Sequence, residues 1–116
     1  MLMIESLLLQ DDSPLGISVN YIAVSEGQCF DADIDTPDVL LILEQQLGLR
    51  IGGSSTTIGA VTADAQIAEL VGVETGAALV WLEDVISDDS GQPWALSQLR
   101  LRGDRIAFSA RSRRSA

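Results

Sequence analysis

The chain has 116 residues, of which 47% are hydrophobic, so it is long enough for one globular domain with a modest core. Seventeen acidic residues against seven arginines give a formal net charge of −10, and the chain contains neither lysine nor histidine. These absences exclude a lysine Schiff base, a phosphate-loop lysine, a histidine-based catalytic triad and histidine metal ligands. Cys29 is the only cysteine, which excludes an intrachain disulfide and fits a reducing cytoplasm.

The distribution of apolar and charged residues sets the expected surroundings of the protein. The longest unbroken apolar stretch, residues 77–82, is too short for a transmembrane helix, and no positively charged region precedes an apolar run at the start. We therefore expect a cytoplasmic protein that has no membrane partner, no cofactor and no metal site. Residues 1–99 contain sixteen acids and one arginine, and such an acidic body should not bind DNA by itself.

The first half of the chain predicts two strands, a loop and a helix. Residues 2–9 and 15–24 have the apolar patterns of paired strands, and residues 27–35 read as a loop. Thr36-Pro37-Asp38 has the residue types of a helix start, and the helix should run through Leu47 and stop at Gly48. Gly52-Gly53 is expected to break the chain before a strand over residues 54–61.

The second half predicts a short helix and a second hairpin. Thr62 is expected to cap a helix over residues 63–71, with Gly72 beyond its end. Residues 78–87 and 94–102 should pair, and residues 105–109 should form a last short strand. Together the elements predict an α+β fold, a mostly antiparallel sheet with two helices on one side. We expect residues 1–109 to form the domain and residues 110–116 to form a flexible arginine-rich tail.

The two predicted hairpins repeat one pattern. Each has an apolar strand that carries a glutamate, then an Asp-Asp-Ser turn, a proline that closes the turn, and a serine four places after that proline. The serines are Ser18 and Ser97, and the second turn is one residue longer. The repeat predicts a pseudo-symmetric sheet in which both serines lie near one cavity. A chance similarity of two short hairpins is the alternative.

Alternation along the return strands separates their two faces. One face carries a set of mostly small residues, and the other carries Gln98, Arg100 and Arg102. The small residues leave room for a ligand or for a packed helix, and the pattern does not decide between the two. This face contains Gly16, Ser18, Asn20 and Ile22 in the first copy, and Ala95, Ser97, Leu99 and Leu101 in the second.

A longer set of motifs resembles a known family. The stretch Thr62-Ala63-Asp64 to Glu74-Thr75-Gly76, the second hairpin with its Asp-Ser-Gly-Gln-Pro turn, and Arg102-Gly103-Asp104-Arg105 together resemble the UTRA domain. This domain is the effector-sensing half of GntR-type transcription regulators of the HutC subfamily. The resemblance implies a chorismate lyase-like fold that lacks its first element, since the family domain begins with a helix and a turn before the first hairpin.

The resemblance also implies a ligand site and the class of its ligand. Family members that bind sugar phosphates place arginines at the positions of Ser6, Leu8 and Asp84, and a hydroxyl residue near Asp38. An anion needs arginine or a helix N-terminus free of competing acid, so the effector should be neutral or cationic. The ligand-binding residues predicted from the resemblance, together with Ser97 from the repeat, are Ser6, Leu8, Ser18, Asp38, Ala95 and Ser97.

The predicted function is small-molecule sensing, without the DNA-binding winged helix and without catalysis. One alternative is a degenerate, non-binding or dimerisation module, and a more remote one is an enzyme of the chorismate lyase type. The latter would need basic groups facing its dicarboxylate, whereas Arg100 and Arg102 face the other way. A homodimer is expected because apolar residues near a free sheet edge, at Leu2, Leu7 and Leu9, favour pairing with a second copy.

Overall fold

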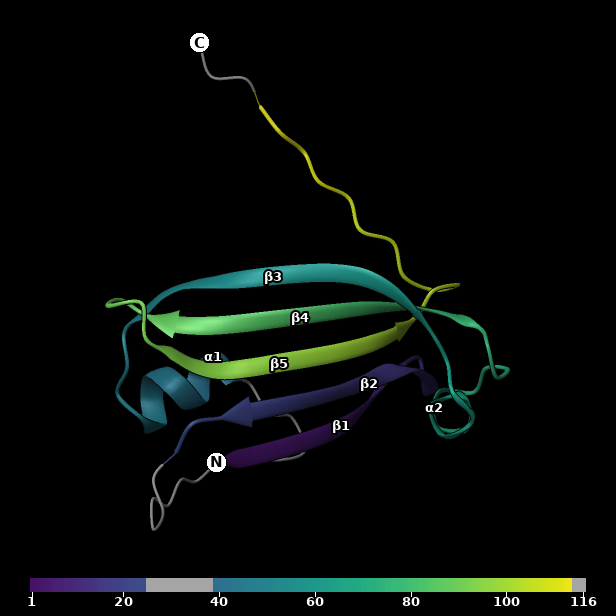
Figure 1. The fold of residues 1–116 in the computed structure, drawn as a ribbon, viewed down its shortest axis with the longest axis horizontal. Helices are drawn as coiled ribbons and strands as arrows, with labels where there is room; N and C mark the ends of the chain where they lie inside the picture. The colour runs from purple at the N-terminus through teal and green to yellow at the C-terminus, as the bar shows by residue number, and fades with distance from the viewer. Residues whose placement is uncertain (25–38, 114–116) are drawn as a thin grey trace.

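One five-stranded antiparallel sheet and two helical segments make up the computed structural model, which describes residues 1–24 and 39–113 (Figure 1). The strands lie in the order β1-β2-β5-β4-β3. This arrangement confirms the predicted α+β fold. In chain order the elements are β1 (Leu2–Gln10), β2 (Ser13–Ile22), α1 (Val39–Leu41), the π-helix η1 (Ile42–Gln46), β3 (Ile51–Thr62), α2 (Ala65–Val71), β4 (Ala78–Asp88) and β5 (Pro93–Arg102).

The two hairpins, β1–β2 and β4–β5, are related by a pseudo-two-fold axis in the middle of the sheet. Ser18 pairs with Leu99, and Ser97 pairs with Asn20. Each serine stands four residues after the proline of its own hairpin. Their partners, Leu99 and Asn20, each stand six residues after the proline of the hairpin to which they belong. Exchanging the two hairpins therefore leaves the pairing of β2 with β5 unchanged. The axis passes through the pair of Val19 and Gln98, which each follow their proline by five residues.

The repeat extends to an irregularity in each hairpin. The register shifts just before Leu9, which pairs with Pro14, and again just before Ser87, which pairs with Pro93. A proline has no N–H for the ladder and is tolerated at the start of a strand or at a bulge. The two hairpins thus share strand pairing, proline position and bulge, as the pseudo-symmetric sheet predicted from the repeat requires.

The helical segments pack on opposite faces of the sheet, so the prediction that both lie on one side is wrong. Ile42 and Leu43 of η1 are buried against Ile22 and neighbouring residues of what we call the η1 face. Ala68 and Val71 of α2 are buried with Leu79, against Ile17 on the other face, the α2 face. Alternating apolar residues on both sides of β2 make two-sided packing possible, and Figure 1 shows the helices at opposite ends of the sheet.

The start of α2 differs from the prediction by two residues. Asp64 is the N-cap, and its side chain accepts a hydrogen bond of 2.9 Å from the backbone N–H of Ile67. Thr62 does not cap the helix, because it pairs with Ala78 as the last residue of β3. Gly72 ends the helix with a left-handed φ of 72°, as predicted from its position.

Two other boundaries also differ from the prediction. β3 begins at Ile51 and continues through Gly52, where a side chain would collide with the backbone of Asp88, so this glycine allows a close approach instead of breaking the strand. Residues 105–109 form no strand. Instead, the N–H of Gly103 donates to Ala78 O (3.0 Å) and a turn follows, after which the chain leaves the sheet, because β2 and β4 already occupy both sides of β5.

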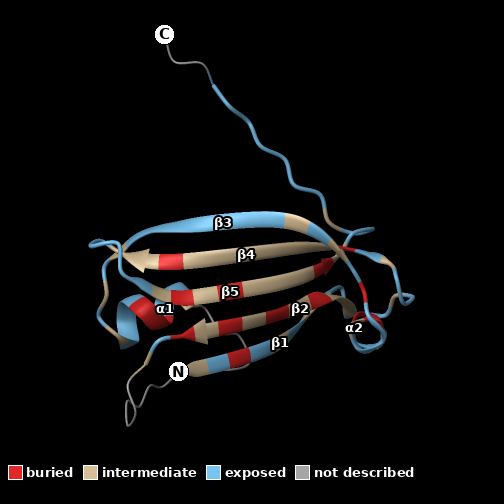
Figure 2. Cartoon of the chain, viewed as in Figure 1, coloured by how far each residue is buried: buried red, intermediate tan, exposed pale blue. Residues whose placement is uncertain are grey.

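The first helical segment is described from Val39, so its predicted start at Thr36–Asp38 lies outside the described residues. It ends at the cap residue Leu47, followed by Gly48 with a φ of 68°, close to the predicted stop. None of the helices in residues 1–24 and 39–113 has the length and apolar composition of a membrane span. Burial is concentrated on β2 and β5, whereas the edge strand β3 is largely exposed (Figure 2).

Candidate functional site

The described residues of the predicted ligand site all belong to the η1 face. Ser6 on β1 pairs with Ser18 on β2, and both stand on this face with Ser97 on β5. Leu8 pairs with Gly16 next to them, and Ala95 is buried in the apolar cluster under η1. Asp38, the remaining predicted residue, lies outside the described residues. The polar part of the predicted set is therefore the three serines.

The strand pairing adds a row of polar side chains that crosses the η1 face. Asn20 on β2 pairs with Ser97 on β5, Ser97 pairs with Asp84 on β4, and Asp84 pairs with Thr56 on β3. These four residues, called the polar row below, come from four adjacent strands. Because paired residues have their side chains on the same face, the row presents hydroxyl, amide and carboxylate groups side by side.

Hydrogen bonds divide the polar row into two pairs. The Ser97 hydroxyl donates to Asn20 Oδ1 at 2.5 Å, and both residues are only 8% exposed. The Thr56 hydroxyl donates to Asp84 Oδ1, and these two side chains lie nearer the edge of the sheet. The buried pair holds the Asn20 amide in one orientation, which leaves its N–H groups as donors. The second carboxylate oxygen of Asp84, Oδ2, stays available as a negatively charged hydrogen-bond acceptor.

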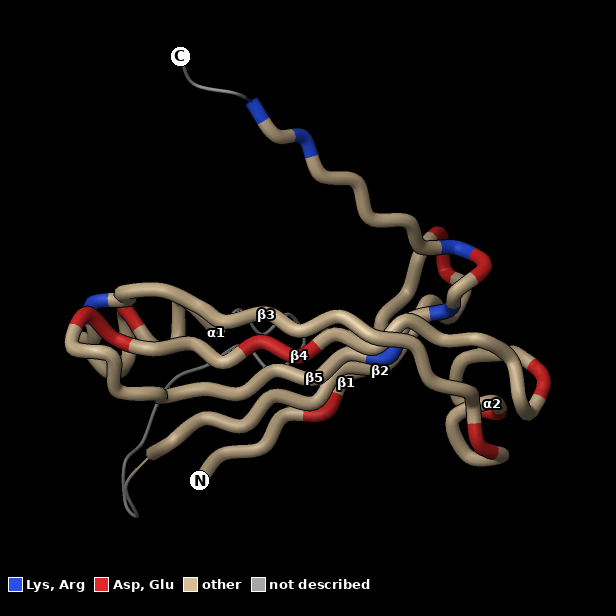
Figure 3. The backbone as a smooth tube through the Cα atoms, turned by 45° about the horizontal axis from the view of Figure 1, so that its top comes forward, with Lys and Arg blue, Asp and Glu red and all other residues tan. Residues whose placement is uncertain are grey.

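The electrostatics of the row suit neutral or cationic groups better than anions. Glu83 and Asp84 form an acidic segment in the middle of β4 (Figure 3). Arg100 and Arg102 alternate onto the opposite face, as predicted, and the Arg102 guanidinium lies 2.8 Å from the carboxylate of Asp104, whose pKa it lowers. No arginine of the described strands stands on the η1 face to neutralise a phosphate there.

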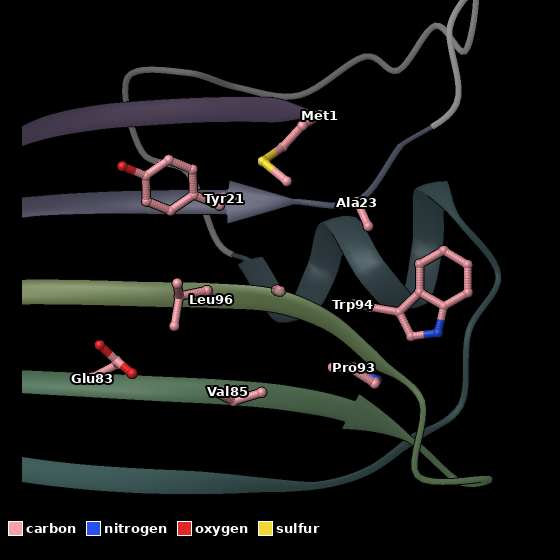
Figure 4. A pocket seen from close by; sticks show the side chains of 9 residues that line it. Met1, Tyr21, Ala23, Glu83, Val85, Pro93, Trp94 and Leu96 are labelled. Carbon is pink, nitrogen blue, oxygen red and sulfur yellow. The ribbon is translucent and has the colours of Figure 1, made fainter.

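A large hollow lies on the α2 face and contrasts with the polar row. It has a volume of about 520 Å³ and walls that are mostly apolar (Figure 4). Its carboxylate, from Glu83, accepts a hydrogen bond of 3.1 Å from Gln98. Recognition of a small molecule needs several convergent polar groups, and the row offers more of them than this hollow. The residues that line the hollow are Met1, Tyr21, Ala23, Glu83, Val85, Pro93, Trp94, Ala95 and Leu96.

The two serines of the repeat share the η1 face, as predicted, on adjacent strands and at 8% exposure each. That they line one ligand cavity stays a prediction. Of the four residues in the row, the sequence analysis selected only Ser97 as ligand-binding, and it named Asp84 only as a position where relatives place an arginine. Asn20 could have been chosen, since it alternates in step with Ser18, but the position of Thr56 depends on the pairing of β3 with β4 across 28 residues.

No cluster of three or more potential metal ligands occurs among the described residues. The four side chains of the polar row are hydrogen-bonding groups that include one carboxylate, Asp84, and they stand on adjacent strands of the sheet. Such a set can orient hydroxyl, amide or ammonium groups of a bound molecule.

Comparisons with known proteins agree with this fold. The UTRA domain model matches residues 1–107. A GntR-family transcriptional regulator from Enterococcus faecalis V583 is 28% identical, with a TM-score of 0.84, over 95% of this chain and 79% of that one. The ligand-binding domain of a GntR-family regulator from Bordetella bronchiseptica superposes with a TM-score of 0.80 at 17% identity, over 96% of this chain and 72% of that one.

A longer protein shows the same fold. YydK from Bacillus subtilis, described as a possible transcriptional regulator, has a TM-score of 0.81 and 19% identity, and the match covers 96% of this chain but only 49% of YydK. The chain thus spans about half the length of that protein. No curated protein matches the chain in sequence. Because the family model covers nearly all of its residues, the chain belongs to the UTRA domain family.

Proposed function

We propose that this chain senses a small-molecule effector for a GntR-family transcription regulator of the HutC subfamily, and that the polar row binds the effector. The observation that carries the proposal is the row itself, in which four adjacent strands contribute Asn20, Ser97, Asp84 and Thr56 to one face. Membership of the UTRA family and the fold shared with a ligand-binding domain from Bordetella bronchiseptica support it.

The effector in this proposal is neutral or cationic. A phosphate near Asp84 would meet a like charge, which is unfavourable by about 1 kcal/mol at roughly 4 Å even in water-like dielectric. An ammonium group would gain from Asp84, and hydroxyl or amide groups would pair with Asn20. Effector binding would favour one arrangement of the domain over another and so change the spacing of attached DNA-binding domains.

Several further properties belong to the same proposal. The domain acts in the cytoplasm, forms a homodimer, does not catalyse a reaction and does not contact DNA itself. A lyase of the chorismate type is disfavoured, because a dicarboxylate needs basic groups beside it and Arg100 and Arg102 are on the opposite face. A gel-shift titration at physiological salt checks the DNA prediction, and sequence-dependent binding of duplex DNA would contradict it.

The test of the effector site is thermal unfolding with a panel of amines, amino acids, polyols and sugar phosphates. A ligand at 100 times its Kd stabilises the folded state by about 2.7 kcal/mol, which is easily measured. We expect stabilisation by an amine or a neutral compound and none by millimolar sugar phosphates. Asp84→Asn should abolish the response to an amine, whereas Glu5→Gln, which removes the same charge from the exposed α2 face of β1, should preserve it.

A dimerisation module without a ligand is the second candidate, and one observation favours it. Met3, Leu7 and Leu9 on the edge strand β1 are 52%, 48% and 56% exposed. Large apolar side chains beside a free sheet edge favour association. If no compound of the panel raises the melting temperature while sedimentation shows a dimer at about 100 µM, well above micromolar dissociation constants, this second function replaces the first.

A further inference from the structure

The helical segment on the η1 face contains one wide turn. The N–H of Leu47 donates to Ile42 O at 3.1 Å, five residues back, where an α-helix would use the carbonyl four residues back. The N–H of Leu49 likewise donates to Leu43 O at 3.0 Å, six residues back. Because π-helical turns are rare in proteins, something other than backbone geometry favours this one.

The wide turn determines which side chains face the sheet. Ile42 is 4% exposed and Leu43 is fully buried, whereas Leu40 and Leu41 are 45% and 49% exposed. Val39 packs at the margin of the same cluster. The turn thus places Ile42 on the sheet and leaves two large apolar side chains near solvent.

A regular α-helix through the same residues would present a different set to the sheet. Its face that contains Leu47 includes the positions three, four and seven residues earlier, and two of these are Leu43 and Leu40. Leu43 would keep its place, Leu40 would turn toward the sheet, and Ile42, five residues before Leu47, would turn away. Leu41 lies outside the sheet-facing positions in both arrangements.

The two registers are closely matched in free energy. The observed register buries Ile42 at the cost of a wide turn, and the shifted register buries Leu40 with regular α-helical hydrogen bonds. Isoleucine and leucine have the same number of carbon atoms, so the apolar area removed from water is similar. The shifted register gains the commoner helix geometry but brings Glu44 to the edge of the apolar face, which opposes that gain. Two packings that are balanced in this way allow a populated minor state.

The buried side of the wide turn adjoins the polar row through Ile4. Ile4 and Ile42 belong to one apolar cluster, and Ile4, which is 6% exposed, pairs with Asn20 across β1 and β2. Paired residues have their side chains on the same face, so Ile4 contacts the surroundings of both. A change of register that withdraws Ile42 therefore alters the packing beside the Asn20 amide.

We propose that the wide turn of η1 is a conformational switch. The segment from Val39 to Leu47 exchanges between the observed register, with Ile42 on the sheet, and a regular α-helix with Leu40 in its place. The α-helical register is the minor state, with a population of roughly 1–10%. Its part in sensing rests on the proposed function, in which an effector on the polar row favours one register, but the exchange itself needs no effector.

Relaxation-dispersion NMR of the full chain tests the switch, because it detects minor states that exchange within microseconds to milliseconds. We expect exchange broadening at the backbone amides of residues 40–47 and at the δ1 methyl of Ile4, with one common rate. The δ1 methyl of Ile67, which packs on the opposite face, should show none. Flat profiles over residues 40–47 would overturn the proposal, and a silent Ile4 methyl would overturn the link to the polar row.

Leu40→Asp and Leu41→Asp form a matched pair, because the two side chains are almost equally exposed in the observed register. Only Leu40 faces the sheet in the shifted register. Leu40→Asp should therefore lower the population of that register by more than about tenfold, since it would bury a carboxylate, and should flatten the dispersion profiles. Leu41→Asp should preserve them. Equal profiles in the two variants would contradict the proposed registers.

Deletion of Gln45, an exposed residue within the wide turn, removes the extra residue of that turn. A regular α-helix then holds Ile42 and Leu43 four and three residues before Leu47, which keeps both on the sheet. We expect a folded chain in which Ile42 stays buried and residues 40–47 no longer exchange. A folded deletion variant with unchanged exchange would overturn the proposal.

Deletion of Glu69 from α2 is the control for removing a residue from a helix. It should lower the melting temperature more than deletion of Gln45 does, because it rotates Val71 away from its buried position. Equal losses would show that η1 has no extra residue to remove. If neither deletion variant folds, the two aspartate variants decide. No effector is added in these experiments, so their outcome is separate from that of the Asp84 test.

Discussion

The hairpins β1–β2 and β4–β5 have the same register and the same bulge opposite a proline, yet their surroundings differ. β4 has β3 on its outer side, and α2 follows β3 onto the neighbouring face, whereas β1 is an edge strand. The side chains of β1 on the α2 face are consequently more exposed than those at the matching positions of β4. The repeat thus determines backbone pairing, while the degree of burial depends on which elements flank each copy.

The same comparison explains why the polar row occurs on one side of the axis only. The axis relates Asn20 to Leu99, Ser97 to Ser18, and Asp84 to Ser6. One row therefore has an amide and a carboxylate where its counterpart has a leucine and a serine. A duplicated backbone offers two equivalent places for a site, and side-chain identity makes only one of them suitable for directional recognition.

The largest expected difference between the two halves concerns burial on the α2 face. Leu79→Ala removes a side chain that is 1% exposed, and such a change in a core typically destabilises a protein by about 2–5 kcal/mol. Met3→Ala on β1 removes a side chain that is 52% exposed, so its effect should stay within about 0.5 kcal/mol. Urea unfolding of both variants measures this. Similar losses of unfolding free energy in the two variants would mean that β1 and β4 are packed equally well on the α2 face.

The next largest expected difference in stability concerns a position of the repeat that is glycine in the first hairpin and alanine in the second. Gly16 and Ala95 each follow their proline by two residues. A Cβ on Gly16 would collide with the carbonyl oxygen of Arg100 and lie 2.8 Å from Leu101 Cδ2, so Gly16→Ala should destabilise by about 1–3 kcal/mol. Ala95→Gly should destabilise by only about 0.5–1 kcal/mol. The same unfolding measurement ranks the two, and the reverse order would contradict the close approach of β2 and β5.

An effect on stability no larger than that of Gly16→Ala is expected when the polar row is made to resemble its counterpart. Asn20→Leu leaves the buried Ser97 hydroxyl without its acceptor, so stability should fall by about 1–3 kcal/mol at most and binding of the effector should be lost. Combining it with Ser97→Ala removes both partners and should recover most of the stability, though not the binding. A double variant less stable than Asn20→Leu alone would show that the hydrogen bond is not what couples the two residues.

How far the sequence predicts this molecule depends on the range of the interactions involved. Alternation and turn residues predicted the four strands of the hairpins, because both signals are local. The placement of α2 on the face opposite η1 was missed, because β2 has apolar residues on both faces. Ile17 packs on the α2 face and Ile22 packs on the η1 face, so the pattern of β2 does not show which face a helix covers. Gly52 suggested a break and instead permits close contact with Asp88. Thr56 joins the candidate site through long-range pairing alone, for which the sequence has no local signal.

The smallest expected effect distinguishes the two turns by their response to acid. Asp88 accepts hydrogen bonds from the hydroxyl and N–H of Ser90, from Gln92 N–H and from Trp94 Nε1, whereas the first turn closes through left-handed φ angles of 50° and 64° at Asp11 and Asp12. These bonds, that from the Ser90 hydroxyl first, lower the pKa of Asp88 from 3.8 to about 2.

Because the folded pKa of Asp88 lies below its unfolded value, the carboxylate stabilises the fold above about pH 4, and this contribution is lost as the pH falls toward about 2. Asp88→Asn should therefore lower the melting temperature at neutral pH and flatten its decline between pH 4 and 2. Asp12→Asn should change neither, since asparagine also tolerates a left-handed φ. Melting temperatures of the three chains across this pH range are the measurement, and equal acid slopes for the parent and Asp88→Asn would show that Asp88 does not hold the second turn.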